Sequence, residues 1–182
     1  MPRIDLITSR DQLPEERRGD YDAIYDILGR VGGPFGVLLH SPGLAPRICQ
    51  AGAHVRLESE LTLAEREIAL LSTAREKDAA YEWAHHVPIA REAGVTDATI
   101  TAIRDRGDLS DLPAPAREII DYTWELLRTN RVSQPTFDAV RERHGERWVV
   151  ELTATIGQYQ YISAINNAFE LEPKPGGEQL PV

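Results

Sequence analysis

The sequence contains almost no cysteine and no long hydrophobic run. Cys49 is the only cysteine in 182 residues, which excludes an internal disulfide, a Cys-x-x-Cys redox pair and a thiolate zinc site. Its place between Ile48 and Gln50 predicts a small side chain that fills space in the core. No stretch approaches the roughly 18 apolar residues of a membrane span, and the first twenty residues have no apolar signal core. We therefore expect a cytoplasmic protein that does not bind a membrane.

Basic charge is scarce as well. The chain has 20 Lys and Arg residues against 29 Asp and Glu residues, which gives a formal net charge of −9. Nucleic acids and anionic membranes bind basic surfaces that displace their counterions, and no cluster of Lys or Arg is present. These partners are therefore excluded, and we expect a small-molecule substrate. The length and the hydrophobic content of 42% are typical of one globular domain.

Strand signals are nearly absent, whereas helix boundaries are frequent. Few alternating β-branched runs occur, and no Asn-Gly or Asp-Gly hairpin turn is present. Thr62 and Glu65 have the spacing of a capping box, Asp78 and Ser133 are expected N-caps, and Gly94 is an expected helix terminator. The expected helices cover residues 15–30, 44–57, 62–77, 78–94, 96–107, 111–130, 133–145 and 146–169, with a short piece at 34–43.

These patterns predict an all-α fold in one domain, residues 1–182. Short connections between the helices favour antiparallel neighbours. Residues 1–14 are an expected N-terminal extension, and residues 171–182 form an expected loose tail.

Three ionisable residues interrupt apolar helix faces. Glu67 shares one face of its helix with alanine and leucine side chains, and Glu82 and His86 interrupt the apolar stripe of the next helix. A carboxylate on a stripe that faces the core is costly unless it is paired or protonated. Because two helices joined by a few residues pack together, we expect these three side chains to share one pocket.

Such a group can transfer protons. Apolar surroundings raise the pKa of a carboxyl group and a nearby imidazolium lowers it, so the three groups would titrate together. Tyr81 and Trp83 are expected to line the pocket, and His85 lies at its boundary. Pro88 removes one helical hydrogen bond and is expected to bend the helix. The alternative is an ordinary glutamate–histidine pair on a helix surface, which stabilises a helix only slightly.

A metal site is a further alternative. Glutamates and histidines on antiparallel helices can form a carboxylate metal site. The chain has no second Glu-x-x-His pair of the kind that such bundles use, so no metal is expected. His40, His54 and His144 are isolated from one another and have no metal-ligand spacing.

The last helix carries polar residues among apolar neighbours. Gln158, Tyr161, Asn166 and Asn167 would line either the same cavity or a packed interface. Of these, Tyr161 and Asn167 are retained as candidate binding residues.

The segments "LTLAEREIALLSTA", "YEWAHHVPIAREAGV" and "NAF" resemble the carboxymuconolactone decarboxylase family, which includes alkylhydroperoxidase D. The resemblance covers residues 40–170 and implies an alkylhydroperoxidase D-like helical bundle that assembles as trimers or hexamers. In the peroxidase branch of the family, the corresponding helix carries Cys-x-x-Cys with a histidine four residues later. Here Ala79 and Glu82 stand at the cysteine positions, His86 at the histidine position, and Glu67 at the position of a glutamate twelve residues before the first cysteine.

Peroxide reduction through a disulfide needs two thiols, so this activity is disfavoured. The leading hypothesis is a cofactor-independent lyase or isomerase for a small organic acid or lactone. Glu82 would be the general acid or base, His86 its relay partner and Glu67 the orienting group. The alternatives are a non-catalytic oligomeric binding protein and residual redox activity at Cys49. A carboxylate clamp would come from Arg47 or from a neighbouring subunit.

Overall fold

The computed structural model describes residues 1–41, 43–173 and 175–181, and the chain within these ranges contains helices and no strand. The helices are α1 (Arg18–Leu28), α2 (Pro34–Leu38), α3 (Leu44–Leu57), α4 (Leu63–Glu76), α5 (Ala80–Glu92), α6 (Asp97–Asp105), α7 (Ala114–Thr129), α8 (Gln134–His144) and α9 (Glu146–Ala168). Short 3-10 turns at Arg10–Gln12 and Glu15–Arg17 precede them. The expected all-α fold is confirmed.

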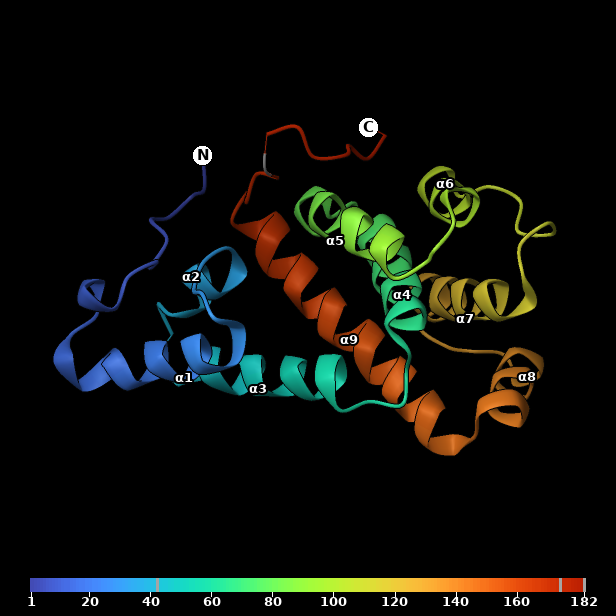
Figure 1. The fold of residues 1–182 in the computed structure, drawn as a ribbon, viewed down its shortest axis with the longest axis horizontal. Helices are drawn as coiled ribbons and strands as arrows, with labels where there is room; N and C mark the ends of the chain where they lie inside the picture. The colour runs from blue at the N-terminus through green and yellow to red at the C-terminus, as the bar shows by residue number, and fades with distance from the viewer. Residues whose placement is uncertain (42, 174, 182) are drawn as a thin grey trace.

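Helix α9 crosses the middle of the molecule and connects its two halves (Figure 1). On one side it packs against α4, α5 and α8, and on the other against α2 and α3. The half that contains α4 to α8 has a large core, to which α9 contributes Trp148, Leu152 and Ile156. The half that contains α1 to α3 has a smaller core, which includes Ile24 of α1 and Ile162 of α9. The long helix therefore lies against both cores.

Helix α4 is the most deeply buried helix. Its contacts with α5, α7 and α9 surround it, and Leu70, Leu71 and Ala74 have no exposed surface. A helix that is buried on nearly all sides holds any polar side chain it carries out of water. The orientation of the buried polar side chains of α4 is therefore set by neighbouring protein groups rather than by water.

The expected capping box at the start of α4 is confirmed. The Glu65 amide donates to the Thr62 hydroxyl at 3.3 Å, and the Thr62 amide donates to the Glu65 carboxylate at 2.8 Å. These two bonds satisfy amides that the first helical turn leaves without a partner.

The cap prediction for Asp78 is wrong, whereas Ser133 stands at the predicted N-cap position without making a cap bond. Asp78 does not cap α5, because its backbone is left-handed (φ 46°) and its carboxylate pairs with Arg75 and Arg106. The N-cap residue is Ala79, which has no side-chain acceptor. Ser133 occupies the N-cap position of α8, but its hydroxyl lies 3.1 Å from the Thr136 hydroxyl and makes no cap bond to the backbone.

Both terminal segments contact the helices. The Ile7 amide donates to the Gly36 carbonyl at 3.1 Å, and the side chains of Ile7 and Leu13 are buried. Beyond α9, Leu171 is buried and Glu178 pairs with Arg91 at 2.9 Å. The segment before α1 thus forms part of the smaller core.

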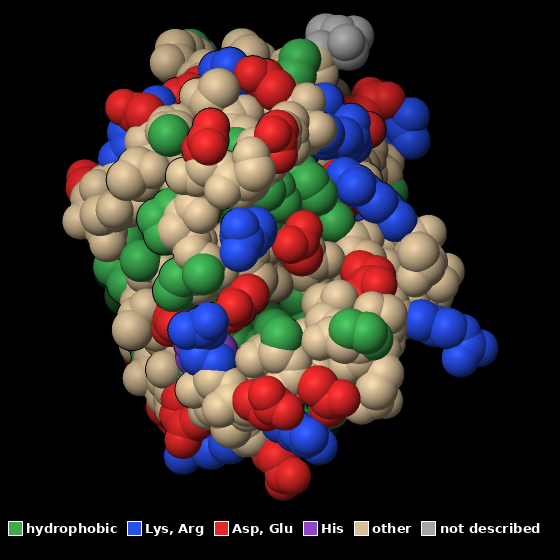
Figure 2. Space-filling view, turned by 90° about the vertical axis from the view of Figure 1, so that its right-hand side faces the viewer, with side chains coloured by type: hydrophobic (Ala, Val, Ile, Leu, Met, Phe, Trp, Pro, Cys, Tyr) green, Lys and Arg blue, Asp and Glu red, His purple; other side chains and the backbone are tan. Residues whose placement is uncertain are grey.

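The surface shown in Figure 2 carries interspersed acidic and basic side chains. In the described part of the chain, no helix combines the length and the apolar character needed to cross a membrane.

The capping box predicts a measurable contribution to stability. Replacing Thr62 by alanine removes the hydroxyl acceptor, and we expect the free energy of unfolding to fall by about 1 kcal/mol. Urea denaturation measures this change. Ser133→Ala is the matched control, since Ser133 also stands at an N-cap but bonds no backbone amide, and it should cost less. Equal losses in the two variants would contradict the assigned role of Thr62.

Candidate active site

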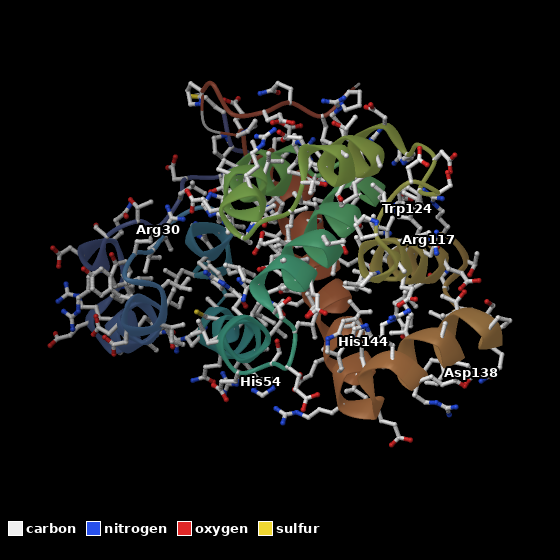
Figure 3. All side chains as sticks on the ribbon, turned by 45° about the vertical axis from the view of Figure 1, so that its right-hand side comes forward. Arg30, His54, Arg117, Trp124, Asp138 and His144 are labelled. Carbon is white, nitrogen blue, oxygen red and sulfur yellow. The ribbon has the colours of Figure 1, made fainter. Side chains whose placement is uncertain are left out.

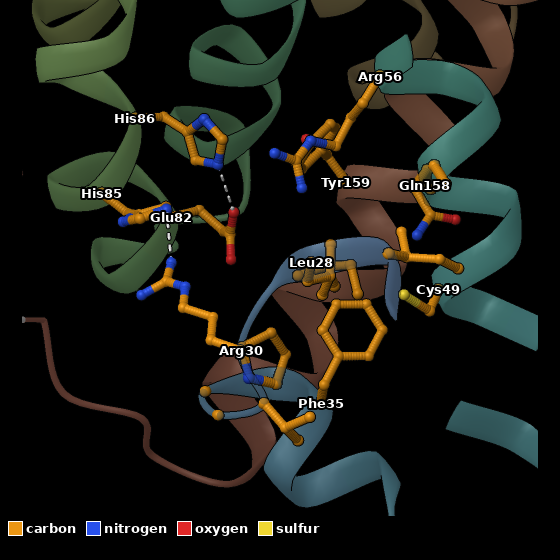
Figure 4. Close-up of a pocket in the computed structure, with 18 of the residues that line it drawn as sticks. Leu28, Arg30, Phe35, Cys49, Arg56, Glu82, His85, His86, Gln158 and Tyr159 are labelled. Carbon is orange, nitrogen blue, oxygen red and sulfur yellow. Dashed lines mark hydrogen bonds and ion pairs between the residues drawn. The ribbon is translucent and has the colours of Figure 1, made fainter. Parts of the chain in front are cut away.

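A cavity of about 290 Å³ lies between α5, α9, α3 and the segment that joins α1 to α2. Figure 4 shows Glu82, His85 and His86 entering it from α5, opposite Cys49 and Arg56 of α3. Tyr159 contributes to the wall from α9. The segment 27–35, with Leu28 among its residues, forms the remaining side.

Glu67 and His86 meet inside the protein. The Nδ1 atom of His86 lies 2.8 Å from the Glu67 carboxylate, and Glu67 is 1% exposed while His86 is 7% exposed. They come from consecutive helices, α4 and α5, whose apolar stripes face each other. A short contact between ionised groups out of water is a strong, orienting hydrogen bond. Glu67 therefore fixes the plane of the His86 ring.

The other nitrogen of His86 faces Glu82. The Nε2 atom lies 3.4 Å from Glu82 Oε2, and Glu82 is 4% exposed. The second oxygen, Oε1, accepts a hydrogen bond from the Asn166 amide of α9 at 2.7 Å. Glu82 lines the cavity, whereas Glu67 lies behind His86. The imidazole therefore connects a carboxylate at the cavity to a carboxylate in the interior.

The pKa of His86 reflects two opposing effects. Burial lowers the pKa of the imidazole, whereas the hydrogen bonds to Glu67 and Glu82 and the charges of both carboxylates raise it. The net result is a pKa above the ordinary value of 6.5. The protonated ring donates from both nitrogens, one to each carboxylate. The two carboxylates thus favour the protonated form of the ring, which can hold a proton between two acceptors.

Arg66 and Tyr159 contact two of the three ionisable residues. The Arg66 guanidinium lies 3.4 Å from Glu67 Oε1 and balances part of the buried negative charge. The Tyr159 ring meets the edge of His86, with ring centroids 5.6 Å apart and an angle of 78°. Burial raises the pKa of the Tyr159 phenol well above its ordinary value, so its hydroxyl stays protonated.

Tyr81 and His85 line the cavity, as the helix pattern predicts. Burial, followed by the charge of Glu82, raises the pKa of the Tyr81 phenol. The phenol also lies against Gly33, where a Cβ atom would come within 2.3 Å of its hydroxyl oxygen. Gly33 has a φ of 53°, which favours glycine for a second reason. The position of Tyr81 thus depends on a glycine at residue 33.

Three candidate binding residues do not line the cavity. Trp83 is fully buried in the larger core, because it lies one position round the helix from Glu82. Tyr161 packs against the smaller core, and Asn167 is exposed and donates to the Lys77 carbonyl at 2.7 Å. We therefore withdraw these three residues from the binding site.

Several residues of the site are missing from the sequence-based set. Arg30 and Arg56 line the cavity, whereas Arg47 donates to the Gly43 carbonyl and is not among the lining residues. Asn166 is one of several polar positions of α9 in the sequence. Nothing in the helical pattern distinguishes these side chains, since each comes from an element distant in sequence from the Glu82 helix.

Cys49 is a buried core residue, as expected, with 1% of its surface exposed. It also forms part of the cavity wall. Burial raises the pKa of its thiol to about 11, although the charge of Arg56 acts in the opposite direction. At neutral pH it is therefore a thiol rather than a nucleophilic thiolate.

The described residues contain no group of three or more His, Cys, Asp or Glu side chains that could hold a metal ion. The remaining histidines lie apart from the site. His54 is on α3 and His144 is at the end of α8 (Figure 3), where it stacks on Trp148 with ring centroids 3.9 Å apart. His40 lies 2.8 Å from the Asp5 carbonyl.

Comparisons with known proteins identify related sequences and folds. Residues 42–115 match the model of the carboxymuconolactone decarboxylase family. A search of curated proteins found no match. A peroxidase-related protein from Silicibacter sp. TM1040 is similar with a TM-score of 0.76 and 17% identity, over 99% of this chain and 96% of that one.

Two further solved structures share the fold. An alkylhydroperoxidase AhpD core protein from Ralstonia eutropha JMP134, also peroxidase-related, has a TM-score of 0.77 and 20% identity, over 96% of this chain and 93% of that one. The debrominase Bmp8 has a TM-score of 0.69 and 16% identity, over 94% of both chains. At these identities the likeness concerns the fold, and the expected alkylhydroperoxidase D-like bundle is confirmed.

The raised pKa of His86 predicts how stability depends on pH. Protonation of His86 stabilises the fold fully below pH 6.5, its ordinary value, and this contribution is lost as the pH rises through the raised pKa. Removing the Glu67 charge lowers the folded-state pKa, so Glu67→Gln should reduce the decline in unfolding free energy above pH 6.5 by up to about 1.4 kcal/mol per pH unit.

Urea denaturation at a series of pH values measures this dependence. Glu92→Gln removes an exposed charge from α5, the helix that carries His86, and should follow the unmodified protein. If Glu67→Gln also kept the unmodified slope, the coupling between Glu67 and His86 would be absent.

Proposed function

We propose, from the match of residues 42–115 to the model of the carboxymuconolactone decarboxylase family, that the chain is a member of this family and a cofactor-independent lyase or isomerase. It acts on a small organic acid or lactone by transferring protons. The observation that carries the proposal is the chain from Glu82 at the cavity, through His86, to the buried Glu67. A general acid or base must reach the reacting atom, and Glu82 is the carboxylate that lines the cavity.

Each of the three residues Glu82, His86 and Glu67 has a distinct role. Glu82 takes a proton from a substrate carbon or delivers one to it, and the Asn166 amide holds its carboxylate in one orientation. His86 shares its Nε2 proton with Glu82 and thereby supplies the next proton. Glu67 keeps the His86 ring in place and compensates its positive charge. When the Glu82–His86 pair gives a proton to the substrate, water that enters the cavity replaces it.

The proton balance is simple for both reaction types. In an isomerisation, Glu82 removes a proton from one carbon and returns it to another. In a decarboxylation, the bond to the carboxylate breaks, carbon dioxide leaves, and the Glu82–His86 pair protonates the carbon that keeps the electron pair. Neither reaction consumes an electron donor, and Tyr159, as a protonated phenol, can donate to an oxygen that gains charge.

Thiol chemistry is the alternative that the similar folds suggest. Those folds include peroxidase-related proteins and a debrominase, and one fold commonly supports several reactions. Two observations favour proton transfer here. Cys49 is the only cysteine, and burial keeps it as a thiol with a pKa of about 11. Disulfide-based peroxide reduction needs a second thiol that the chain does not have.

A non-catalytic binding protein is the remaining alternative. It predicts that the three ionisable groups form a closed network with no cavity beside them. The cavity that reaches Glu82 and His86 supports the enzymatic proposal instead. Assembly as a trimer or hexamer, which the family resemblance implies, remains part of the proposal. Leu57 and Val150 are 73% and 66% exposed and are candidates for contacts between subunits.

Removing the charge of Glu82 should stop the reaction. The assay incubates the protein in D2O with a panel of small lactones, β-keto acids and unsaturated acids, and follows deuterium incorporation and carbon dioxide release by NMR. Glu82→Gln and His86→Ala should each lower turnover about 10²- to 10⁴-fold, with helix content unchanged. Glu92→Gln, on the exposed side of the same helix, should retain full activity.

Full turnover in Glu82→Gln would refute the role of that carboxylate. If the unmodified protein turned over no member of the panel, the proposed lyase or isomerase activity would be refuted.

A further inference from the structure

The cavity is positively charged although the chain as a whole carries a net charge of −9. Among the described residues that line it, Arg30 and Arg56 carry guanidinium groups, whereas Glu82 is the one carboxylate and already lies beside His86. A cationic cavity in an acidic protein selects small anions, since anions are repelled from the rest of the surface. The excess of positive charge is local and belongs to specific side chains.

Arg56 reaches the cavity from α3, and Figure 4 shows its guanidinium beside Tyr159. Burial raises the pKa of both the Cys49 thiol and the Tyr159 phenol, and the Arg56 charge opposes the increase in each. Its charge therefore acts within the cavity. No carboxylate among the described residues forms an ion pair with Arg56, so the guanidinium keeps its donors for a ligand.

Arg30 enters from the segment between α1 and α2. Its Nη2 atom lies 3.4 Å from the Nε2 atom of His85 (Figure 4). No described carboxylate pairs with Arg30 either. Several arginines elsewhere have acidic partners: Arg106 and Arg128, for example, share Glu76 at 3.0 and 2.7 Å. The two cavity arginines thus differ from those that stabilise the fold.

We propose that Arg30 and Arg56 form an anion-binding subsite that takes the carboxylate of a small monocarboxylic acid. Guanidinium groups bind carboxylates through paired, charge-assisted hydrogen bonds. The apolar part of the ligand would lie against Leu28, Phe35 and Ile162, which also line the cavity. This inference rests on the proposed function, because it places the carbon chain of the acid within reach of Glu82.

The size of the cavity limits the ligand further. A volume of about 290 Å³ is at the lower end of the range for small-molecule sites. A monocarboxylic acid with one ring or a short chain fits this volume. Arg30 and the rest of segment 27–35 lie outside residues 42–115, where the family model matches. The subsite is therefore built partly by the N-terminal segment of this chain.

Calorimetric titration with benzoate tests the subsite, with benzamide as the neutral isostere. Benzoate should bind at least tenfold more tightly than benzamide. Arg56→Met and Arg30→Met should each weaken benzoate binding at least tenfold, and Arg56→Lys should recover part of the loss. Arg131→Met is the matched control, since Arg131 is exposed and also lacks an acidic partner among the described residues; it should bind benzoate normally.

Equal affinity for benzoate and benzamide, or normal binding in both cavity variants, would overturn the inference. Inorganic phosphate provides a further arm: if it bound as tightly as benzoate, the subsite would accept anions generally and the assignment to a carboxylate would be wrong. Circular dichroism of each variant separates lost binding from lost folding.

Glu82→Gln separates this inference from the proposed function. It removes the negative charge beside the subsite, so benzoate should bind at least as tightly as before while turnover is lost. Retained turnover with arginine-dependent binding would refute only the proposed function. Lost turnover with binding that does not depend on the arginines would refute only the subsite.

Discussion

The pairing of His86 with two buried carboxylates is the constraint on which the rest of the site depends. Burying an unpaired carboxylate is costly, so a positive partner that stays charged out of water stabilises Glu67 and Glu82. His86 meets this need at 2.8 Å from one carboxylate and 3.4 Å from the other. Removing the imidazole would leave both carboxylates without their shared partner. The same pairing keeps a mobile proton beside a cavity.

The fold places these groups by combining local and distant elements. Helices α4 and α5 are consecutive and pack against each other, which brings Glu67 to His86. Helix α9 supplies Asn166 and the Tyr159 ring from the far end of the sequence. Helix α3 and segment 27–35 form the opposite wall of the cavity. The ionisable groups thus come from the middle of the sequence, whereas the ligand cavity is formed by both halves of the molecule.

The sequence predicts the local part of this arrangement well and the distant part poorly. The 3.6-residue period places Glu67, Glu82 and His86 on facing apolar stripes, and the structure brings these three together. Trp83 fails as a binding residue because one step along a helix turns a side chain by about 100° and into the core. Helical periodicity does not show which arginine reaches a cavity formed by separate elements. Arg30 and Arg56 are therefore identified only by the structure.

The central claim is that His86 is an imidazolium held between Glu67 and Glu82. Nitrogen-15 NMR of protein labelled at histidine measures the protonation of both ring nitrogens directly. At pH 7 both nitrogens of His86 should carry protons, with shifts typical of an imidazolium. Shifts typical of a neutral ring at pH 7, with one nitrogen unprotonated, would contradict it.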